Sequence, residues 1–371
     1  MIRCLVYPLA AAVLGSCASA PAENPSLPPP PVQMEAQAPA DIVTVSAGAK
    51  TSYLPPDQLR AASQYSAARR GLSFLVIQHG KTLWEDYPNG SSRGEPHKIF
   101  SGTKAFWNLA ALKAQEDGLL DLDERVGDTI PSWREDSRRS RVTIRQLLDF
   151  TAGLDPMFHL HSDGLSDRDS MAVNARMVSS PGSDFLYGPS CLQVFHEILK
   201  HKLARRGESP THYLERKVLG PLDLGPQRYV ADHSGNPLCA SGFKLTAREW
   251  SRVGELLLNQ GSPVISPTSY QNFRSGTSAN RAFAFGLWNN TNAARSGARE
   301  PDIEDTLELD WQRENWHGVC LCRDAPSDLI ASVGSGYQRL YVIPSMDLII
   351  VRQGTNAKFS DGQFLRILLG R

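Results

Sequence analysis

Four residues, Ser101-Gly102-Thr103-Lys104, constrain the fold and the chemistry of this chain more than any other stretch. The apolar residues that follow them recur at helical spacing, so the sequence predicts that Ser101 lies at or near a helix start. In a helix, residues i and i+3 lie on one face about 5–6 Å apart at Cβ, which lets the Lys104 amine reach the Ser101 hydroxyl. The spacing therefore predicts a nucleophile beside a base.

A serine hydroxyl is rarely ionised near neutral pH and needs a neighbouring group that takes its proton. A partly desolvated lysine with a lowered pKa can do this, and backbone N–H groups at a helix N-terminus favour the developing negative charge. Taken alone, Ser-x-x-Lys is also the pattern of an N-cap serine followed by a solvated lysine. The surrounding sequence has to decide between these two interpretations.

The surrounding sequence resembles the serine β-lactamase-related family, which includes class C β-lactamases, D-alanyl-D-alanine carboxypeptidases and related esterases. SGTKAF at Ser101–Phe106 and GLLDLDERV at Gly118–Val126 are similar to the family's S-x-T-K-S/A-F and G-x-L-x-L-D-D/E-x-V. TIRQLLDFTAGL at 143–154 is similar to T-I-R-x-L-L-x-x-T-S-G-L. We expect Thr143 to cap a helix there and Gly153 to end it.

A later segment, FLYGPS at Phe185–Ser190, resembles the family's F-x-Y-S/A-N motif. The resemblance implies that Tyr187 relays a proton between the serine and the leaving group. Pro189 stands where the family usually has Asn, so the amide that helps to bind substrate carbonyls is missing, and Ser190 is the expected partial substitute. The alternative for Tyr187 is an ordinary half-buried core tyrosine.

The segment Gly334-Ser335-Gly336-Tyr337 lies where the family carries Lys/His-Thr/Ser-Gly on the strand beside the nucleophile. The resemblance implies that the Ser335 hydroxyl contacts the substrate, with Gly336 in the motif. It also implies that the backbone N–H groups of Ser101 and Tyr337 form an oxyanion hole. Gly334 replaces the cation that would anchor a substrate carboxylate, unless an Arg or Lys elsewhere compensates. The simpler alternative is that this segment is only a turn.

The resemblance covers roughly Leu72 to Gly354 and implies an α+β fold for a domain at residues 49–371. An antiparallel sheet flanked by helices would form from the two ends of this domain, with an all-helical insertion at about 123–234. Thr246 and Glu249 predict a capping box. The strand candidates are Leu72–Ile77, Thr82–Tyr87, Ala282–Trp288, Leu329–Val333, Arg339–Pro344 and Leu348–Arg352, and a helix is predicted at Gly362–Leu369.

The N-terminal segment is predicted to consist of a targeting signal followed by an extended tether. Residues 1–17 have a positively charged start, an apolar run and the lipobox-like sequence LGSC, so we expect a lipoprotein-type signal peptide with a lipid anchor at Cys17. Simple cleavage after Ala20 is the alternative. The Pro- and Ala-rich residues 18–48 indicate an extended tether. The expected location is the bacterial cell envelope, facing the periplasm.

The charge balance and the cysteines limit which ligands and partners the chain is expected to bind. Lys+Arg and Asp+Glu both number 39, so no basic excess points to nucleic acid. Pairing among Cys191, Cys239, Cys320 and Cys322 stays open. Cys320 and Cys322 would share a face in a strand and could bind a metal with His317, although an exported chain more often uses such residues as disulfides or buried thiols. We expect no metal, no cofactor and a monomer.

The loop from Pro156 to Arg168 carries two histidines, His159 and His161, and two aspartates, Asp163 and Asp167, and could also suggest a metal cluster. It lacks a regular ligand spacing. A solvated, substrate-facing loop is the commoner outcome for such a segment.

Two function classes follow. The first is a serine hydrolase that forms an acyl-enzyme with a small ester, amide or peptide. It would be esterase-like, with weak β-lactam or D-Ala-D-Ala hydrolysis because Gly334 and Pro189 remove a cation and an amide. The second is a catalytically impaired relative that binds cell-wall peptide or another ligand. Retention of Ser101, Lys104 and Tyr187 favours the first, and the absence of a G-x-S-x-G elbow disfavours an α/β-hydrolase.

Overall fold

The computed structural model describes residues 52–307, 315–355 and 357–371. The expected signal peptide at 1–17, the lipid anchor at Cys17 and the tether at 18–48 lie outside the described residues and stay predictions, as does the monomeric state. Within the described ranges, no helix combines the length and the apolar character needed to cross a membrane.

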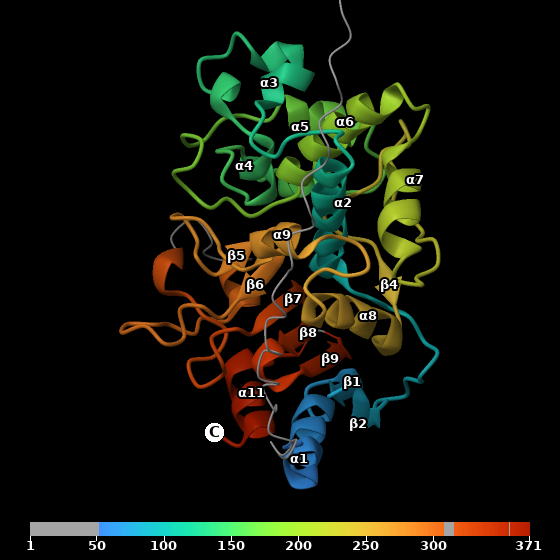
Figure 1. The fold of residues 1–371 in the computed structure, drawn as a ribbon, viewed down its shortest axis with the longest axis vertical. Helices are drawn as coiled ribbons and strands as arrows, with labels where there is room; N and C mark the ends of the chain where they lie inside the picture. The colour runs from blue at the N-terminus through green and yellow to red at the C-terminus, as the bar shows by residue number, and fades with distance from the viewer. Residues whose placement is uncertain (1–51, 308–314, 356) are drawn as a thin grey trace, which may run out of the picture. The chain divides into compact units, whose positions relative to one another are not determined.

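A seven-stranded antiparallel sheet brings the two ends of the described chain together (Figure 1). Its strand order is β2-β1-β9-β8-β7-β6-β5, so the first hairpin pairs with the last strand. The strands are β1 Gly71–Gln78, β2 Lys81–Asp86, β5 Phe283–Ala284, β6 Leu287–Asn289, β7 Ile330–Gly334, β8 Gln338–Ile343 and β9 Leu348–Gly354. A separate pair consists of β3 (His97–Lys98) and β4 (Lys244–Leu245).

Helices cover both faces of the large sheet. On one face, α1 (Pro56–Ala67) packs against α11 (Asp361–Leu369), whose Phe364 contacts Tyr341 of β8. On the other face, Gly254 of α8 (Ala247–Leu258) lies against Ile349, because a Cβ on Gly254 would come within 2.6 Å of that side chain. Tyr341 pairs with Ile350, so Ile349 points to the opposite face. This arrangement confirms the predicted α+β fold.

The elements between Val126 and Leu219, a fully described stretch, are helices and helical turns. Thr143 caps α4 in a capping box with Gln146, and the predicted box of Thr246 and Glu249 is present at α8. The helices of this part are α3 Val126–Thr129, α4 Ile144–Leu148, α5 Arg168–Val173, α6 Ser190–Ala204 and α7 Pro210–Leu214, and the short α9 Pro267–Tyr270 and α10 Ile303–Asp305 follow later in the chain.

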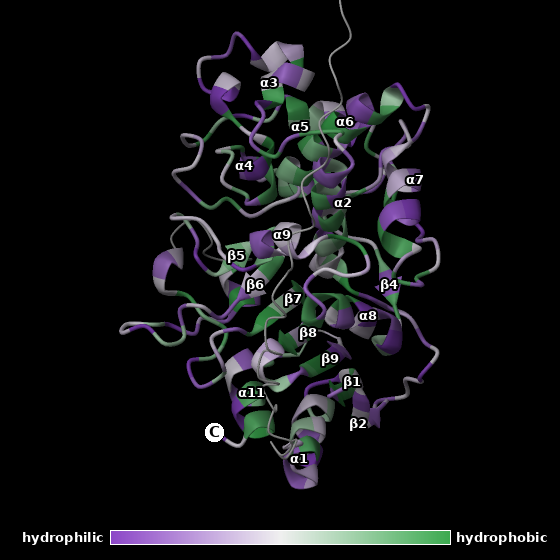
Figure 2. Ribbon diagram, viewed as in Figure 1, coloured by the Kyte–Doolittle hydropathy of each residue, from purple (hydrophilic) through white to green (hydrophobic). Residues whose placement is uncertain are grey.

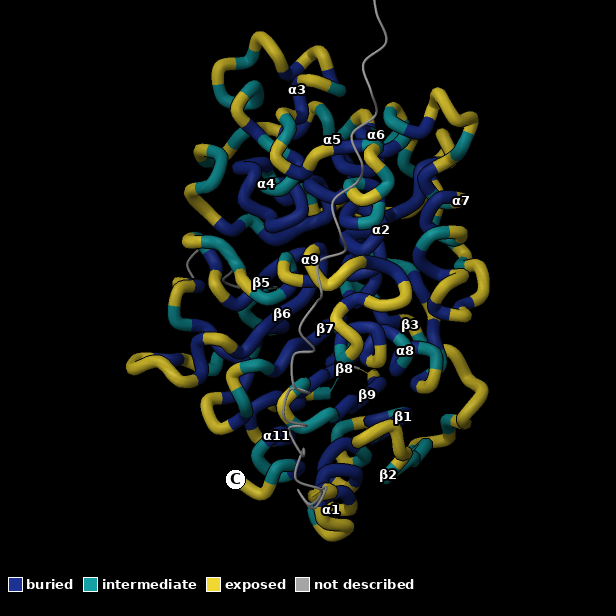
Figure 3. The backbone as a smooth tube through the Cα atoms, viewed as in Figure 1, coloured by how far each residue is buried: buried dark blue, intermediate teal, exposed yellow. Residues whose placement is uncertain are grey.

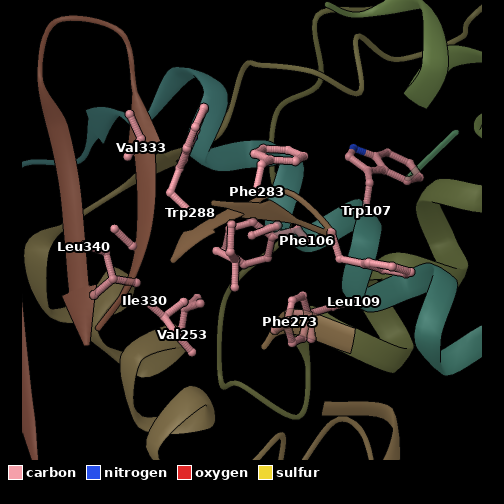
Figure 4. Packing of buried hydrophobic residues seen from close by; sticks show 14 of the residues in the cluster. Phe106, Trp107, Leu109, Val253, Phe273, Phe283, Trp288, Ile330, Val333 and Leu340 are labelled. Atoms are coloured by element: carbon pink, nitrogen blue, oxygen red, sulfur yellow. The ribbon is translucent and has the colours of Figure 1, made fainter. Parts of the chain in front are cut away.

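Helix α2 (Lys104–Glu116) connects the sheet with the helical part (Figure 1). Most of its residues are buried, as expected for a helix that is apolar on nearly all sides, and Figures 2 and 3 show this apolar, buried centre. Trp107 contacts His196 of α6, and Phe106 contacts Phe243. Figure 4 shows Phe106 and Leu109 in one apolar cluster with strand residues. The nucleophile candidate therefore precedes the most buried helix.

Two predicted details are wrong. The single strand predicted at Ala282–Trp288 is a tight hairpin, because Phe285 and Gly286 have φ of 48° and 81° and reverse the chain between β5 and β6. Gly153 lies beyond the end of α4 and does not terminate it. Its φ is 81°, and a Cβ there would lie 2.4 Å from the Ser179 carbonyl oxygen, so glycine is required by close packing.

The cysteines outside the N-terminal segment are free and buried: Cys191, Cys239, Cys320 and Cys322. Cys322 shares a cluster with Glu300 and Asp324, whose candidate ligand atoms lie within 4.8 Å of one another. Arg366 pairs with both of these carboxylates. A guanidinium therefore already supplies positive charge to this cluster.

Candidate active site

Ser101 lies in a 3₁₀ turn, Phe100–Thr103, directly before α2. Phe100 has φ of 45°, a left-handed conformation that bulky residues rarely adopt, and it turns the chain sharply into the helix. The Lys104 N–H closes the turn on the Ser101 carbonyl. Side chains at i and i+3 of a 3₁₀ turn eclipse each other, which places the Lys104 side chain beside the Ser101 hydroxyl.

The Lys104 amine donates to Ser101 Oγ at 2.8 Å and to the Ala240 carbonyl oxygen at 3.0 Å. Lys104 is 1% exposed, and no carboxylate of the described residues forms an ion pair with it. Burial without a counter-charge disfavours the ammonium form and lowers the pKa of Lys104 to about 7. A neutral amine at this distance can accept the Ser101 proton.

The third predicted group, Tyr187, lies next to this pair. Lys104 Nζ is 4.7 Å from the centroid of the Tyr187 ring, and Phe150 and Phe283 contact the ring edge to face. Burial raises the pKa of Tyr187, and its hydrogen bond with Ser101 acts in the opposite direction. A phenol with a raised pKa stays protonated at neutral pH, so Tyr187 holds a proton that it can donate.

Ser101, Lys104 and Tyr187 line one cavity of about 270 Å³. This is at the small end of ligand sites and suits a reacting carbonyl with its nearest substituents. The other lining residues are mainly apolar or small, with one carboxylate: Phe158, His161, Gly188, Glu304, Leu307, Val333, Gly334 and Ser335. The structure therefore brings four of the predicted site residues together, Ser335 being the fourth.

Gly334 brings β7 close to the turn that carries Ser101. A Cβ on Gly334 would lie 2.0 Å from the carbonyl oxygen of Ile99, two residues before Ser101. A side chain at this position would displace that turn. The glycine that the sequence presents as a missing cation thus has a steric reason.

Contrary to the prediction from the sequence, the hairpin turn after β7 does not place the Tyr337 N–H group in an oxyanion hole. The N–H groups of Gly336 and Tyr337 donate to the Glu304 carboxylate at 2.5 and 2.9 Å, and the Tyr337 hydroxyl donates to Asp302 at 3.1 Å. The Tyr337 N–H is therefore held by a carboxylate and is not presented to Ser101. Neither Gly336 nor Tyr337 is among the residues that line the cavity.

Glu304 is the main site residue that sequence reasoning missed. It is 8% exposed, and besides the hairpin N–H groups its carboxylate lies 3.5 Å from Arg339, which is fully buried and also bonded to Asp361. Glu304 lies in the short helix α10, far from the hairpin in sequence. The only sequence signal in this region is the acidic run around Asp302, which is typical of a capped helix start.

The remaining predicted residues lie near the cavity. Ser190 begins α6 and is buried, but it is not among the residues that line the cavity. In the loop expected to face the substrate, Phe158 and His161 do line the cavity. Asp167 instead caps α5, and none of this loop's residues belongs to a metal-type cluster in the described part of the chain.

A model of the Beta-lactamase family matches residues 57–357 of the chain. Among curated proteins, "Protein flp" of Staphylococcus aureus (strain MRSA252) is 24% identical over an alignment of 192 residues that covers 47% of this chain and 38% of that protein. The match therefore spans less than half of the length of this relative.

Solved structures share the fold at low sequence identity. "EstCE1, a hydrolase with promiscuous acyltransferase activity" superposes with a TM-score of 0.60 at 17% identity, covering 84% of this chain and 95% of that chain. A D-stereospecific amidohydrolase from Streptomyces sp. gives 0.59 at 15% identity, covering 85% and 98%. Because the family model spans most of the sequence and the fold agrees with it, the chain belongs to the beta-lactamase family.

Proposed function

We propose that this chain is a serine hydrolase that forms an acyl-enzyme at Ser101. The observation that carries the proposal is the 2.8 Å contact between Ser101 Oγ and the buried amine of Lys104, whose pKa is about 7. A base with a pKa near the working pH is the most effective proton acceptor.

The reaction divides into two steps. In the first, Ser101 Oγ attacks the carbonyl carbon while its proton passes to Lys104. The bond to the leaving group breaks, Tyr187 gives its proton to the departing atom, and Lys104 returns a proton to Tyr187. In the second, water attacks the acyl carbon, its proton moves through the same groups to Ser101 Oγ, and the acid is released. A positioned acid or base contributes about 10²–10⁴-fold.

For the oxyanion hole we propose the backbone N–H groups of Ser101 and Ser335. Two contacts support this assignment: Ser335 borders the cavity, and Gly334 brings this part of the strand against the nucleophile turn. The Tyr337 N–H, in contrast, donates to Glu304. Backbone donors held in place before the reaction stabilise the tetrahedral intermediate without reorganising.

The proposed substrates are small acyl esters, with β-lactams and D-Ala-D-Ala peptides turned over weakly. Among the described residues that line the cavity, Lys104 is the only Lys or Arg, and its amine already donates a hydrogen bond to Ser101. Glu304 adds a carboxylate to the same cavity. A substrate carboxylate placed there would lack a charge-assisted partner, a loss of about 1.5–3 kcal/mol. The similarity to EstCE1, described as a hydrolase with promiscuous acyltransferase activity, supports acyl transfer as the type of reaction.

The test is to treat the purified protein with a fluorophosphonate probe, measure its intact mass, and compare kcat/KM for p-nitrophenyl butyrate, nitrocefin and a D-Ala-D-Ala peptide. We expect one adduct, lost in Ser101→Ala and kept in Ser92→Ala, an exposed serine before the turn. Absence of both adduct and turnover in the wild type would instead support the impaired, ligand-binding class. Efficient nitrocefin turnover would refute the substrate assignment alone.

A further inference from the structure

A second and larger pocket, of about 740 Å³, adjoins the catalytic cavity. The two share His161, and Phe100, which lines the second pocket, directly precedes Ser101. Ser241 also lines it and follows Ala240, whose carbonyl accepts from Lys104. The second pocket therefore reaches the nucleophile turn from the side of Phe100 and Ser241.

Positive charge gathers around this second pocket. Lys98, Arg228 and Lys244 line it with one acidic residue, Asp163. Lys98 and Lys244 are directly opposite each other in the β3–β4 pair. Opposite residues of an antiparallel pair have Cβ atoms about 4.5–5.5 Å apart, and like charges at that spacing are destabilising.

These three cations have no ion-pair partner within the described ranges, and all three are exposed. A carboxylate partner is present for another exposed cation, Arg248, which pairs with Glu85. The repulsion between the two opposed lysines is therefore left uncompensated at the rim of a pocket that opens beside the nucleophile.

We propose that the second pocket binds an anionic group, a carboxylate or a phosphate, at the far end of the substrate's acyl chain. This inference rests on the proposed function. Tyr187 lines only the first cavity, and as the proton donor it must meet the leaving group there. The acyl chain consequently extends in the other direction, past Phe100 toward Lys98 and Lys244.

The chain geometry limits the length of that acyl group. Lys98 precedes Ser101 by three positions, and a chain spans at most ~3.6 Å per residue, so their Cα atoms lie within about 11 Å. An acyl chain of adipate or suberate length suits this range.

The experiment compares kcat/KM for p-nitrophenyl monoesters of adipate and suberate with their ω-methyl esters, which differ only in the terminal charge. The corresponding ω-phosphonate esters distinguish phosphate from carboxylate. In the wild type at low salt, we expect at least one anionic ester to exceed its neutral partner about fivefold or more, with the ratio falling as salt is added. Lys98→Gln/Lys244→Gln should bring that ratio close to one.

The matched control is Lys81→Gln/Lys358→Gln, which removes the same charge from two exposed positions that line neither pocket and should keep the preference. Equal rates for all charged and neutral pairs, or a preference that survives the Lys98→Gln/Lys244→Gln change, would overturn the inference while leaving the hydrolase proposal intact. Failure to turn over any ester, with no adduct at Ser101, would overturn both.

Discussion

The two walls of the catalytic cavity hold their polar groups in opposite ways. On the helix wall, Lys104 is buried without a counter-charge, and its pKa of about 7 suits proton transfer. On the strand wall, Glu304 is bound to backbone N–H groups and lies beside Arg339, so charge is matched by charge. Lys104, which has no counter-charge, is suited to exchange a proton, whereas Glu304 and Arg339, which are paired, are suited to hold the strand side of the cavity in place.

A bulky residue in the left-handed region also lies next to each wall, although neither residue lines the cavity. Phe100 has φ of 45° beside the nucleophile, and Tyr337 has φ of 58° in the hairpin turn. Such a conformation costs of order 1–3 kcal/mol and persists only where the surroundings enforce it. At Tyr337 the bonds to Glu304 and Asp302 do so. At Phe100 the neighbouring strand contributes, since Gly334 leaves room for the turn.

Lys104→Met should produce the largest change, because it removes the base from the helix wall. We expect kcat/KM for an ester to fall by about 10³-fold or more. The free energy of unfolding of the Lys104→Met protein should exceed that of the wild type below pH 10.5. Between pH 7 and 10.5 the unfolded lysine holds a proton that the folded one has lost, so wild-type stability rises with pH in that window. At pH 7 and below, burial of the amine costs up to about 4–5 kcal/mol.

Chemical denaturation at pH 7 with parallel ester assays would measure both effects. Lys113→Met, a partly exposed lysine on the same helix, is the control and should keep its activity. A Lys104→Met protein that is inactive because it is much less stable would contradict the description of the helix wall.

Tyr187→Phe keeps the ring that Phe150 and Phe283 contact and removes only the hydroxyl. We expect a loss of about 10²-fold or more in kcat with little change in melting temperature. The loss should be greatest for substrates with poor leaving groups, which need the proton most. Tyr53→Phe, at an exposed site, is the matched control. Equal losses for p-nitrophenyl and alkyl esters would argue against a proton donor.

Gly334→Ala tests whether the strand wall needs close contact with the nucleophile turn. The added methyl would collide with the Ile99 carbonyl and push the two walls apart. A shift of about 1 Å at a reacting group can cost about 10²-fold, and overpacking costs about 1–3 kcal/mol in stability. Gly94→Ala, where the added atom meets open space, serves as the control. Full activity in Gly334→Ala would show that the steric explanation is wrong.

Glu304→Gln should have the smallest effect of the four. The amide keeps one oxygen for one hairpin N–H group, turns its NH2 group toward the other and loses the charge beside Arg339. Because hydrogen bonds to charged groups contribute about 1.5–3 kcal/mol, we expect roughly tenfold lower kcat/KM and a similar loss of stability. Steady-state kinetics and thermal unfolding, with exposed Glu255→Gln alongside, would show this. Unchanged values would mean that Glu304 does not fix the hairpin.

The two walls also differ in how far sequence could predict them. The contact between Ser101 and Lys104 depends on i to i+3 spacing, and the caps at Thr143 and Thr246 follow equally local rules. Residue patterns of this kind, in which the partners are a few positions apart, can be recognised directly in the sequence. Tyr187 came from a short motif with no detectable spacing to Ser101, so its position became visible only in the fold.

The strand wall depends on contacts between distant segments. Glu304 lies 32 residues before Gly336, and its partners there are backbone N–H groups, which every residue except proline possesses. Such a contact leaves no signature in sequence. The same reason explains Gly334: its nearest neighbour is the backbone of Ile99, so the sequence shows a lost cation where the structure shows a close approach.

The most direct test of the central claim is the pH dependence of acyl-enzyme formation at Ser101, measured by rapid quench and intact mass with a p-nitrophenyl ester. With Lys104 as the base, the acylation rate should rise about tenfold per pH unit below pH 7 and level off above it, and Lys104→Met should abolish this rise. An acylation rate independent of pH from about 5 to 9, or an adduct on a residue other than Ser101, would contradict the account.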